Sequence, residues 1–148
     1  MKIWKVSAGI LIALVSTMAI ANPTWLETAK VWVQYVGGEE IPNEGMPLAT
    51  QKLELALEGS LIPGATYEVE SVMVHVAEGH RPFGKMEYTS QDIEHGVLDL
   101  SKLYAVSDRS PKKGDRVIIE VTMANKVLPN GEVQPVKINT LPRSISLR

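Results

Sequence analysis

The chain of 148 residues contains no cysteine, a single phenylalanine and few aromatic residues of any kind. The lack of cysteine excludes disulfides, thiolate catalysis, cysteine-ligated metals and a lipid-modified N-terminal cysteine. Neither sign of charge is in strong excess, because the chain has 15 Lys and Arg and 17 Asp and Glu. This balance gives no electrostatic reason to expect nucleic acid or anionic lipid as a partner. A packed core and a hydrogen-bonded backbone must therefore stabilise the fold.

The first 21 residues have the pattern of a secretory signal peptide. Lys2 and Lys5 give a positive start, Val6–Val15 is a short apolar run, and Ala19-Ile20-Ala21 is a small-x-small cleavage site. A membrane-spanning helix needs about 20 apolar residues, so retention as an anchor is the weaker alternative. We expect a periplasmic or secreted bacterial protein, exported by the Sec route. Residues 22–148 would form one domain with no membrane span, and loss of the two lysines lowers the formal charge from −2 to −4.

Strand patterns dominate the rest of the sequence. Lys52–Glu58 alternates apolar and polar residues, which places its three leucines on one face. Ala29–Val36 is rich in β-formers, with Trp32 on the face opposite Val31, Val33 and Tyr35. Both segments are expected to be half-buried strands.

A third run changes the parity of its apolar positions. They are Tyr67 and Val69, followed on the other parity by Val72, Val74 and Val76. This change predicts a β-bulge near Glu70 and Ser71, or a strand that crosses between sheets.

The C-terminal third has the clearest hairpin signal. We expect a strand over Arg116–Met123 whose inward residues are Val117, Ile119, Val121 and Met123. Asn130-Gly131 predicts a type I′ turn, and Glu132–Asn139 returns as the partner strand. Pro135 makes part of that partner an edge or a bulge, and residues 143–147 add a last short strand.

Helix is scarce, and the connections are polar. Asp99–Ala105 is the best helical candidate, about two turns long. Gly37–Pro47 and His80–Gln91 are expected to be long loops because they hold several Gly, Pro and polar residues. Many short strands at turn-marked intervals predict an all-β fold, an antiparallel β-sandwich with at most one short helix.

The segment Pro111–Val121, which reads PKKGDRVIIEV, together with the Asn130-Gly131 hairpin, resembles the C-terminal domain of the gliding-motility protein GldM. Those domains have a similar Lys-Gly-Asp turn into an apolar strand, then a glycine hairpin and a short closing strand. Tyr67–Val74 is similar to their preceding strand, and the resemblance extends over Pro63–Leu147. It implies an immunoglobulin-like sandwich that serves as a periplasmic building block of a secretion or motility machine, without an active site. The chain departs from the family plan because it is a single short domain.

The sequence has no clear catalytic or metal-binding motif. Ser71, Ser90 and Ser107 lie outside any Gly-x-Ser-x-Gly elbow, and the scattered carboxylates are more typical of a solvated surface. Metal binding would need His75, His80 and His95 to converge, although no pair of them has a spacing that puts two ligands on one face. We therefore expect no enzymatic activity and no cofactor.

Binding is the stronger interpretation. The Gly79–Gly84 segment holds the single phenylalanine, with an arginine two positions before it, and exposed aromatic and Arg residues are typical binding anchors. Phe83 has an alternative role as a plug at the end of the sandwich. The contact candidates are Trp32, Arg81 and Phe83.

The leading hypothesis is an exported, non-enzymatic protein that binds other cell-envelope proteins by strand addition near Pro135. One alternative is a carbohydrate- or small-ligand-binding module that stacks its ligand on Trp32 or Tyr35. Another is a small metal-binding protein built on the three histidines. The sequence leaves self-association open.

Overall fold

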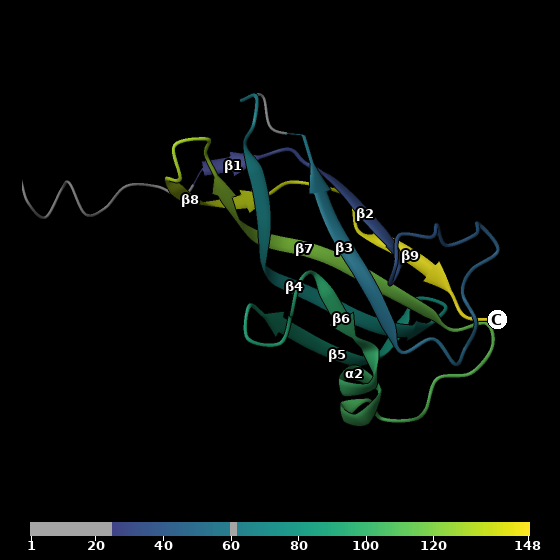
Figure 1. Ribbon diagram of the computed structural model, residues 1–148. Coiled ribbons are helices and arrows are strands. Elements are labelled where there is room, and N and C mark those ends of the chain that lie inside the picture. The colour runs from purple at the N-terminus through teal and green to yellow at the C-terminus, as the bar shows by residue number, and fades with distance from the viewer. Residues whose placement is uncertain (1–24, 60–61) are drawn as a thin grey trace, which may run out of the picture.

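The period-two patterns form strands in two sheets that pack together (Figure 1). The computed structural model describes residues 25–59 and 62–148, and the predicted leader lies outside that range. The elements in chain order are β1 (Trp25–Glu27), β2 (Lys30–Tyr35), β3 (Lys52–Glu58), β4 (Thr66–Glu78), β5 (Arg81–Thr89), β6 (Val97–Asp99), α2 (Leu100–Val106), β7 (Arg116–Val127), β8 (Val133–Ile138) and β9 (Arg143–Ser146).

The larger sheet has the order β1-β8-β7-β4-β5. β8 pairs with the C-terminal part of β7, and β9 pairs with its N-terminal part, Arg116–Ile119. The smaller sheet has the order β2-β3-β6. Every strand pair is antiparallel except β1–β8, which is parallel. The predicted all-β sandwich with one short helix is therefore confirmed, with one parallel pair at the edge.

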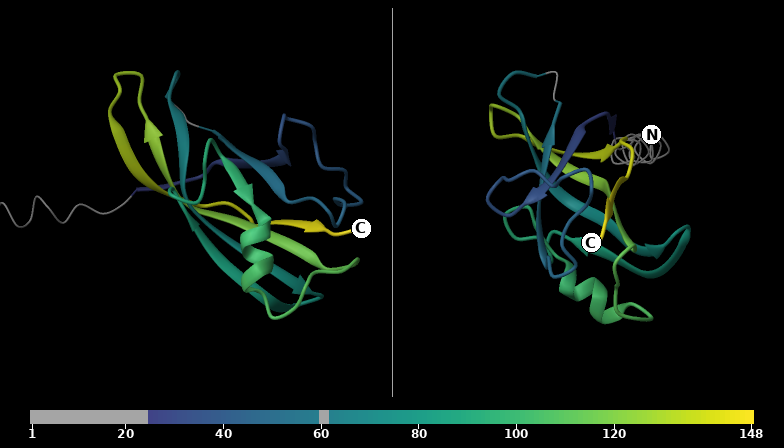
Figure 2. Two further views of the ribbon diagram at one scale, coloured as in Figure 1. Left: turned by 60° about the horizontal axis from the view of Figure 1, so that its bottom comes forward. Right: turned by 90° about the vertical axis from the view of Figure 1, so that its right-hand side faces the viewer.

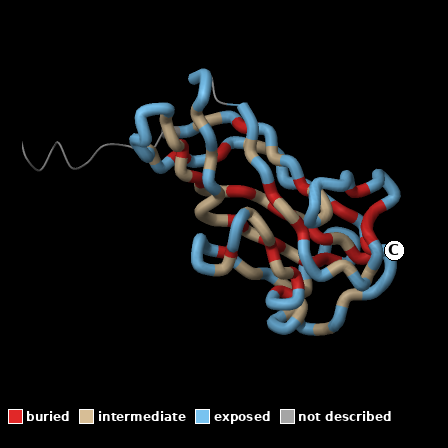
Figure 3. Tube along the Cα trace, viewed as in Figure 1, coloured by how far each residue is buried: buried red, intermediate tan, exposed pale blue. Residues whose placement is uncertain are grey.

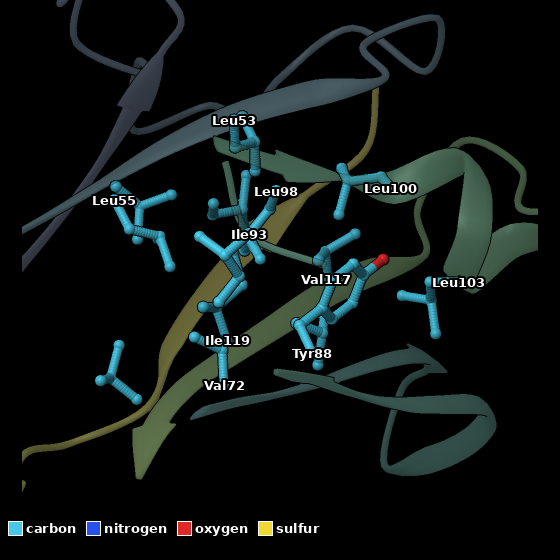
Figure 4. Close-up of a cluster of buried hydrophobic side chains, with 14 of the residues drawn as sticks. Leu53, Leu55, Val72, Tyr88, Ile93, Leu98, Leu100, Leu103, Val117 and Ile119 are labelled. Atoms are coloured by element: carbon cyan, nitrogen blue, oxygen red, sulfur yellow. The ribbon is translucent and has the colours of Figure 1, made fainter. Parts of the chain in front are cut away.

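The core lies between the sheets, where β4 and β7 run through the middle of the larger one (Figures 2 and 3). Figure 4 shows how the two sheets and the helix meet over this core. Burial of each large aliphatic side chain contributes about 1.5–3 kcal/mol to the free energy of folding. The fully buried members of the core include Leu53, Val72, Val74, Val76, Tyr88, Leu98, Leu100, Leu103, Val117 and Val121. The hydroxyl of Tyr88 donates a hydrogen bond of 2.7 Å to the carbonyl of Asp99, and burial raises the pKa of Tyr88 to about 12.

The predicted irregularity in β4 is present and extends to β7. The pairing shifts between Val69 and Ser71 and again between Ser71 and Val72. Glu70 on β4 and Thr122 on β7 consequently have no opposite residue, and both strands change the parity of their buried positions together. We name this feature the β4–β7 irregularity.

The change of parity on β7 corrects one expectation. Met123 is half-buried rather than inward, and Ala124 takes the buried position. The hydroxyl of Thr122 donates to the carbonyl of Ser71 at 3.1 Å, which satisfies a backbone group where the ladder is interrupted.

The prediction of a loop over His80–Gln91 is wrong, because most of this segment forms strand β5. Gly79, with φ 57°, and His80 form a two-residue turn between β4 and β5. Pro82 and Gly84 are tolerated because β5 is the edge of its sheet and Phe83 is an extra residue in the ladder between them. Arg81 and Phe83 are therefore on an edge strand.

The hairpin between β7 and β8 is confirmed, but its turn differs from the prediction. The amide of Gly131 donates to the carbonyl of Leu128 at 2.9 Å, and the amide of Leu128 donates to the carbonyl of Glu132 at 2.9 Å. Gly131 has φ 85°, whereas Asn130 is not left-handed. This is a three-residue loop, in which Pro129 favours a type I turn and Gly131 forms the bulge, instead of a type I′ turn.

The remaining expected elements are close to their predicted bounds. Pro135 lies on β8 opposite Asn125, beyond the three residues that β1 covers. Asp99 caps helix α2, because its carboxylate accepts from the amide of Ser101 at 3.0 Å. The last strand, β9, follows as expected, and residues 36–51 form the expected loop, with a bridge from Glu40 to Gln34.

Two glycines of that loop offer a matched test of the packing against β9. Gly45 and Gly37 have similar left-handed φ values of 111° and 104°, so both are strained by a side chain. A Cβ on Gly45 would lie 2.1 Å from the backbone oxygen of Ser146, whereas a Cβ on Gly37 meets nothing within 4 Å. We expect Gly45→Ala to destabilise the protein by about 1–3 kcal/mol more than Gly37→Ala. Urea unfolding measures both, and equal losses would contradict the contact.

Candidate functional site

A cleft of about 580 Å³ opens between β3 and the N-terminal part of β4. This volume is in the range of ligand-binding clefts. In Figure 1 β3 and β4 lie apart above β6. The β5–β6 connection adds Ser90, Ile93, His95 and Gly96 to the lining of the cleft. The β3–β4 cleft is lined by Leu55, Ala56, Leu57, Ala65, Thr66, Tyr67, Glu68, Val69, Glu70, Ser90, Ile93, His95 and Gly96.

The cleft exists because the neighbouring strands stop early. β6 pairs with β3 only over Lys52–Glu54, after which the amide of Leu55 donates to the carbonyl of Gly96 at 2.8 Å. β5 pairs with β4 only from Ser71 onward. Within the described part of the chain, Ala56–Glu58 and Glu68–Glu70 therefore have no strand partner on the sides that border the cleft.

The two faces of these edges differ in chemistry. Leu57, Val69 and Ile93 pack against the core and make the inner wall apolar. Glu68 and Glu70 have the opposite parity to Val69, and the side-chain amide of Asn125 donates to the Glu70 carboxylate at 2.6 Å. The described lining contains two glutamates and no lysine or arginine, so its formal charge is negative.

A buried ion pair holds the N-terminal part of β4 in place. The ammonium of Lys126 lies 2.6 Å from a carboxylate oxygen of Glu27, and the hydroxyl of Tyr67 donates to the other oxygen. Burial raises the pKa of Glu27, but the hydrogen bonds from Lys126 and Tyr67 outweigh it and leave the pKa below 4.5. The arrangement ties β1, β4 and β7 together beneath the cleft.

The lower end of the cleft is a tight connection between the sheets. The amide and hydroxyl of Thr89 both donate to the carboxylate of Asp92, at 3.0 and 3.1 Å, and these bonds lower the pKa of Asp92. Ile93 then enters the core. A Cβ on Gly96 would lie 2.8 Å from the oxygen of Leu55, so glycine permits this close approach.

Trp32 lies on the outer face of the smaller sheet, opposite Ala56 in the register of β2 and β3. It is 38% exposed, and its indole donates to Glu58 at 3.1 Å. The ammonium of Lys30 lies 3.8 Å from the ring centroid, so this cation covers one face of the indole. Trp32 is one strand away from the β3–β4 cleft.

Phe83 belongs to a different part of the molecule. Its ring is half-buried against the core, and the guanidinium of Arg109 stacks over it at 3.8 Å. Arg109 also pairs with Asp115 at 2.8 Å and with Glu78 at 2.9 Å. Arg81 is exposed and lies opposite Glu78 on the hairpin. The contact role of Trp32, Arg81 and Phe83 stays a prediction, and none of the three lines the β3–β4 cleft.

The histidines are divided between two places. His75 and His80 line a hollow of about 270 Å³ on the larger sheet, whereas His95 lines the β3–β4 cleft. Among residues 25–59 and 62–148, no three His, Asp or Glu side chains are grouped to hold a metal ion. Tyr35, the other candidate for carbohydrate stacking, packs against the core.

Sequence reasoning missed the cleft residues, among them Leu57, Glu68 and Val69. The available signal was the parity change after Val69, because a strand that changes phase there can lose a neighbour at the same point. The strand that β4 loses as a neighbour at this point is β5. The sequence of β5 predicts a loop because it contains Pro82 and Gly84.

Comparisons with family models, with curated proteins and with solved structures found no match to this chain. Within the described ranges, no helix has the length and apolar character needed to cross a membrane.

The cluster around Asp115 predicts a pH-dependent stability. The hydrogen bonds from Arg109 lower the pKa of Asp115 below 3.8, so its contribution is complete above pH 3.8 and is lost as the pH falls through the folded pKa. We expect Asp115→Asn to lower the free energy of unfolding by about 1.5–3 kcal/mol at pH 7. The difference from the wild type should shrink below pH 3.8. Thermal unfolding from pH 3 to pH 7 measures it, and a difference that stays constant with pH would contradict the assignment.

Proposed function

We propose that this chain is an exported, non-enzymatic β-sandwich that binds an extended segment of another cell-envelope protein. The segment is added as a strand in the β3–β4 cleft. The observation that carries the proposal is a pair of strand edges, Ala56–Glu58 and Glu68–Glu70, on the two walls of one cleft, which have no strand partner among the described residues. Backbone groups at such edges are unpaired donors and acceptors, and an extended peptide satisfies them with main-chain hydrogen bonds.

Three other edges of the sandwich, at β5, β9 and β8, are less suited to strand addition. The amide of Asp108 donates to the carbonyl of Phe83 at 2.9 Å, and helix α2 packs beside β5. The end of β9 is covered by the Met46–Leu48 segment, whose amides donate to Ser146 and Arg148 at 2.9 Å. The uncovered part of β8 includes Pro135, which has no amide proton to donate. The β3–β4 cleft is therefore favoured over the edge near Pro135.

The envelope setting is supported by two features of the sequence. Residues 1–21 have the signal-peptide pattern, and Pro63–Leu147 resembles the C-terminal domain of GldM. Both fit a building block of an assembly outside the cytosol. A carbohydrate site on Trp32 is less well supported, because Lys30 occupies one face of the ring.

The absence of cysteine allows a direct test of the binding site. Ala56→Cys places one thiol at the rim of the cleft, and Lys113→Cys places one on an exposed turn before the opposite end of β7. Each variant is expressed in its own host, exported, labelled outside the cytosol with benzophenone-maleimide, photolysed and analysed by mass spectrometry. We expect the label at residue 56 to cross-link one discrete stretch of an envelope protein, with at least tenfold less of that product from residue 113.

The two labels carry the same reactive group, so their difference reports position alone. Equal recovery of that product from both sites would contradict the proposed function, as would the lack of any discrete product at residue 56.

A further inference from the structure

We infer that the segment bound in the β3–β4 cleft alternates apolar residues with lysine or arginine. The inference rests on the proposed function and adds the chemistry of the partner. Successive side chains of an added strand point to opposite faces of the sheet. One set would therefore meet the inner wall of the cleft and the other its outer rim.

The inner wall requires apolar side chains. Leu57 on β3 and Val69 on β4 pack against the core, and Ile93 closes the space between them. A polar side chain placed there would lose its hydration without gaining a partner. Every second residue of the segment is consequently apolar.

The outer rim carries carboxylates on both strands. Glu68 and Glu70 on β4 line the cleft and have the opposite parity to Val69. Glu58 on β3 directly follows Leu57 of the lining, has the opposite parity to it, and lies opposite Lys30 of β2. None of the three carboxylates takes part in a described ion pair. Their described hydrogen-bond donors are neutral, namely the indole of Trp32 for Glu58 and the amide of Asn125 for Glu70.

An added strand would lie about 4.8 Å from the edge with which it pairs. At that spacing, its outward side chains become cross-strand neighbours of these carboxylates. Opposite charges in such positions stabilise strand pairing, and like charges destabilise it. Lysine or arginine is therefore favoured in the segment, and aspartate or glutamate is disfavoured.

Three fluorescein-labelled nine-residue peptides test the inference. They alternate valine with lysine, with glutamate or with threonine, and fluorescence anisotropy gives their dissociation constants. We expect the valine–lysine peptide to bind about tenfold more tightly than the valine–glutamate peptide. Raising the salt concentration should weaken this preference, because the rim is exposed.

Glu68→Lys is the test variant, because Glu68 is exposed and no described side-chain contact depends on it. Glu44→Lys is the matched control: the same change of charge on an exposed loop residue outside the cleft. We expect Glu68→Lys to reduce the preference for the lysine peptide about threefold or more, and Glu44→Lys to leave it unchanged.

The outcomes separate the inference from the proposed function. Equal or tighter binding of the glutamate or threonine peptide would overturn the basic segment and leave strand addition intact. The lack of saturable binding by all three peptides would also overturn the inference, whereas the cross-linking result at residue 56 decides the proposed function independently. An equal loss of preference in both variants would mean that net charge, and not the rim of the cleft, attracts the peptide.

Discussion

The β4–β7 irregularity is the constraint on which the rest of the structure depends. These two strands form the middle of the larger sheet, and both change the parity of their inward residues at Glu70 and Thr122. On one side of that point, Val72, Val74 and Val76 face the core together with their β7 neighbours. On the other side, residues of the opposite parity face inward, and β5 no longer pairs with β4. One irregularity thus divides the sandwich into a closed half and an open half.

The two halves differ in how they are stabilised. The closed half buries aliphatic side chains from both sheets and from α2, and its edge at β5 is covered. The open half adds a polar cluster to its apolar interior, in which Lys126 is buried beside the half-buried Glu27 and Tyr67. A buried ion pair adds little net stability, since desolvation offsets most of the attraction, but removing one partner is costly. The pair therefore fixes the placement of β1 and β4, and the cleft keeps a defined shape.

Local patterns account for much of the fold and for little of the site. The bounds of β3 follow directly from its alternation, and Asp99 marks the start of α2 because its side chain can cap a helix. The parity change after Val69 locates the irregularity. By contrast, Pro82 and Gly84 indicate a loop unless the strand is known to be an edge, and edge position is a property of the whole sheet. The cleft could not be predicted from local patterns for the same reason, because it depends on where β5 and β6 end relative to strands distant in sequence.

Amide hydrogen exchange with and without the valine–lysine peptide tests the central claim most directly, because exchange reports new backbone hydrogen bonds residue by residue. The account predicts that the peptide slows exchange within Glu68–Glu70 or Ala56–Glu58, the edges that border the cleft. Exchange at the uncovered end of β8, Val133–Gln134, should be unchanged. Slowed exchange at β8 with no change at the cleft edges would contradict the account.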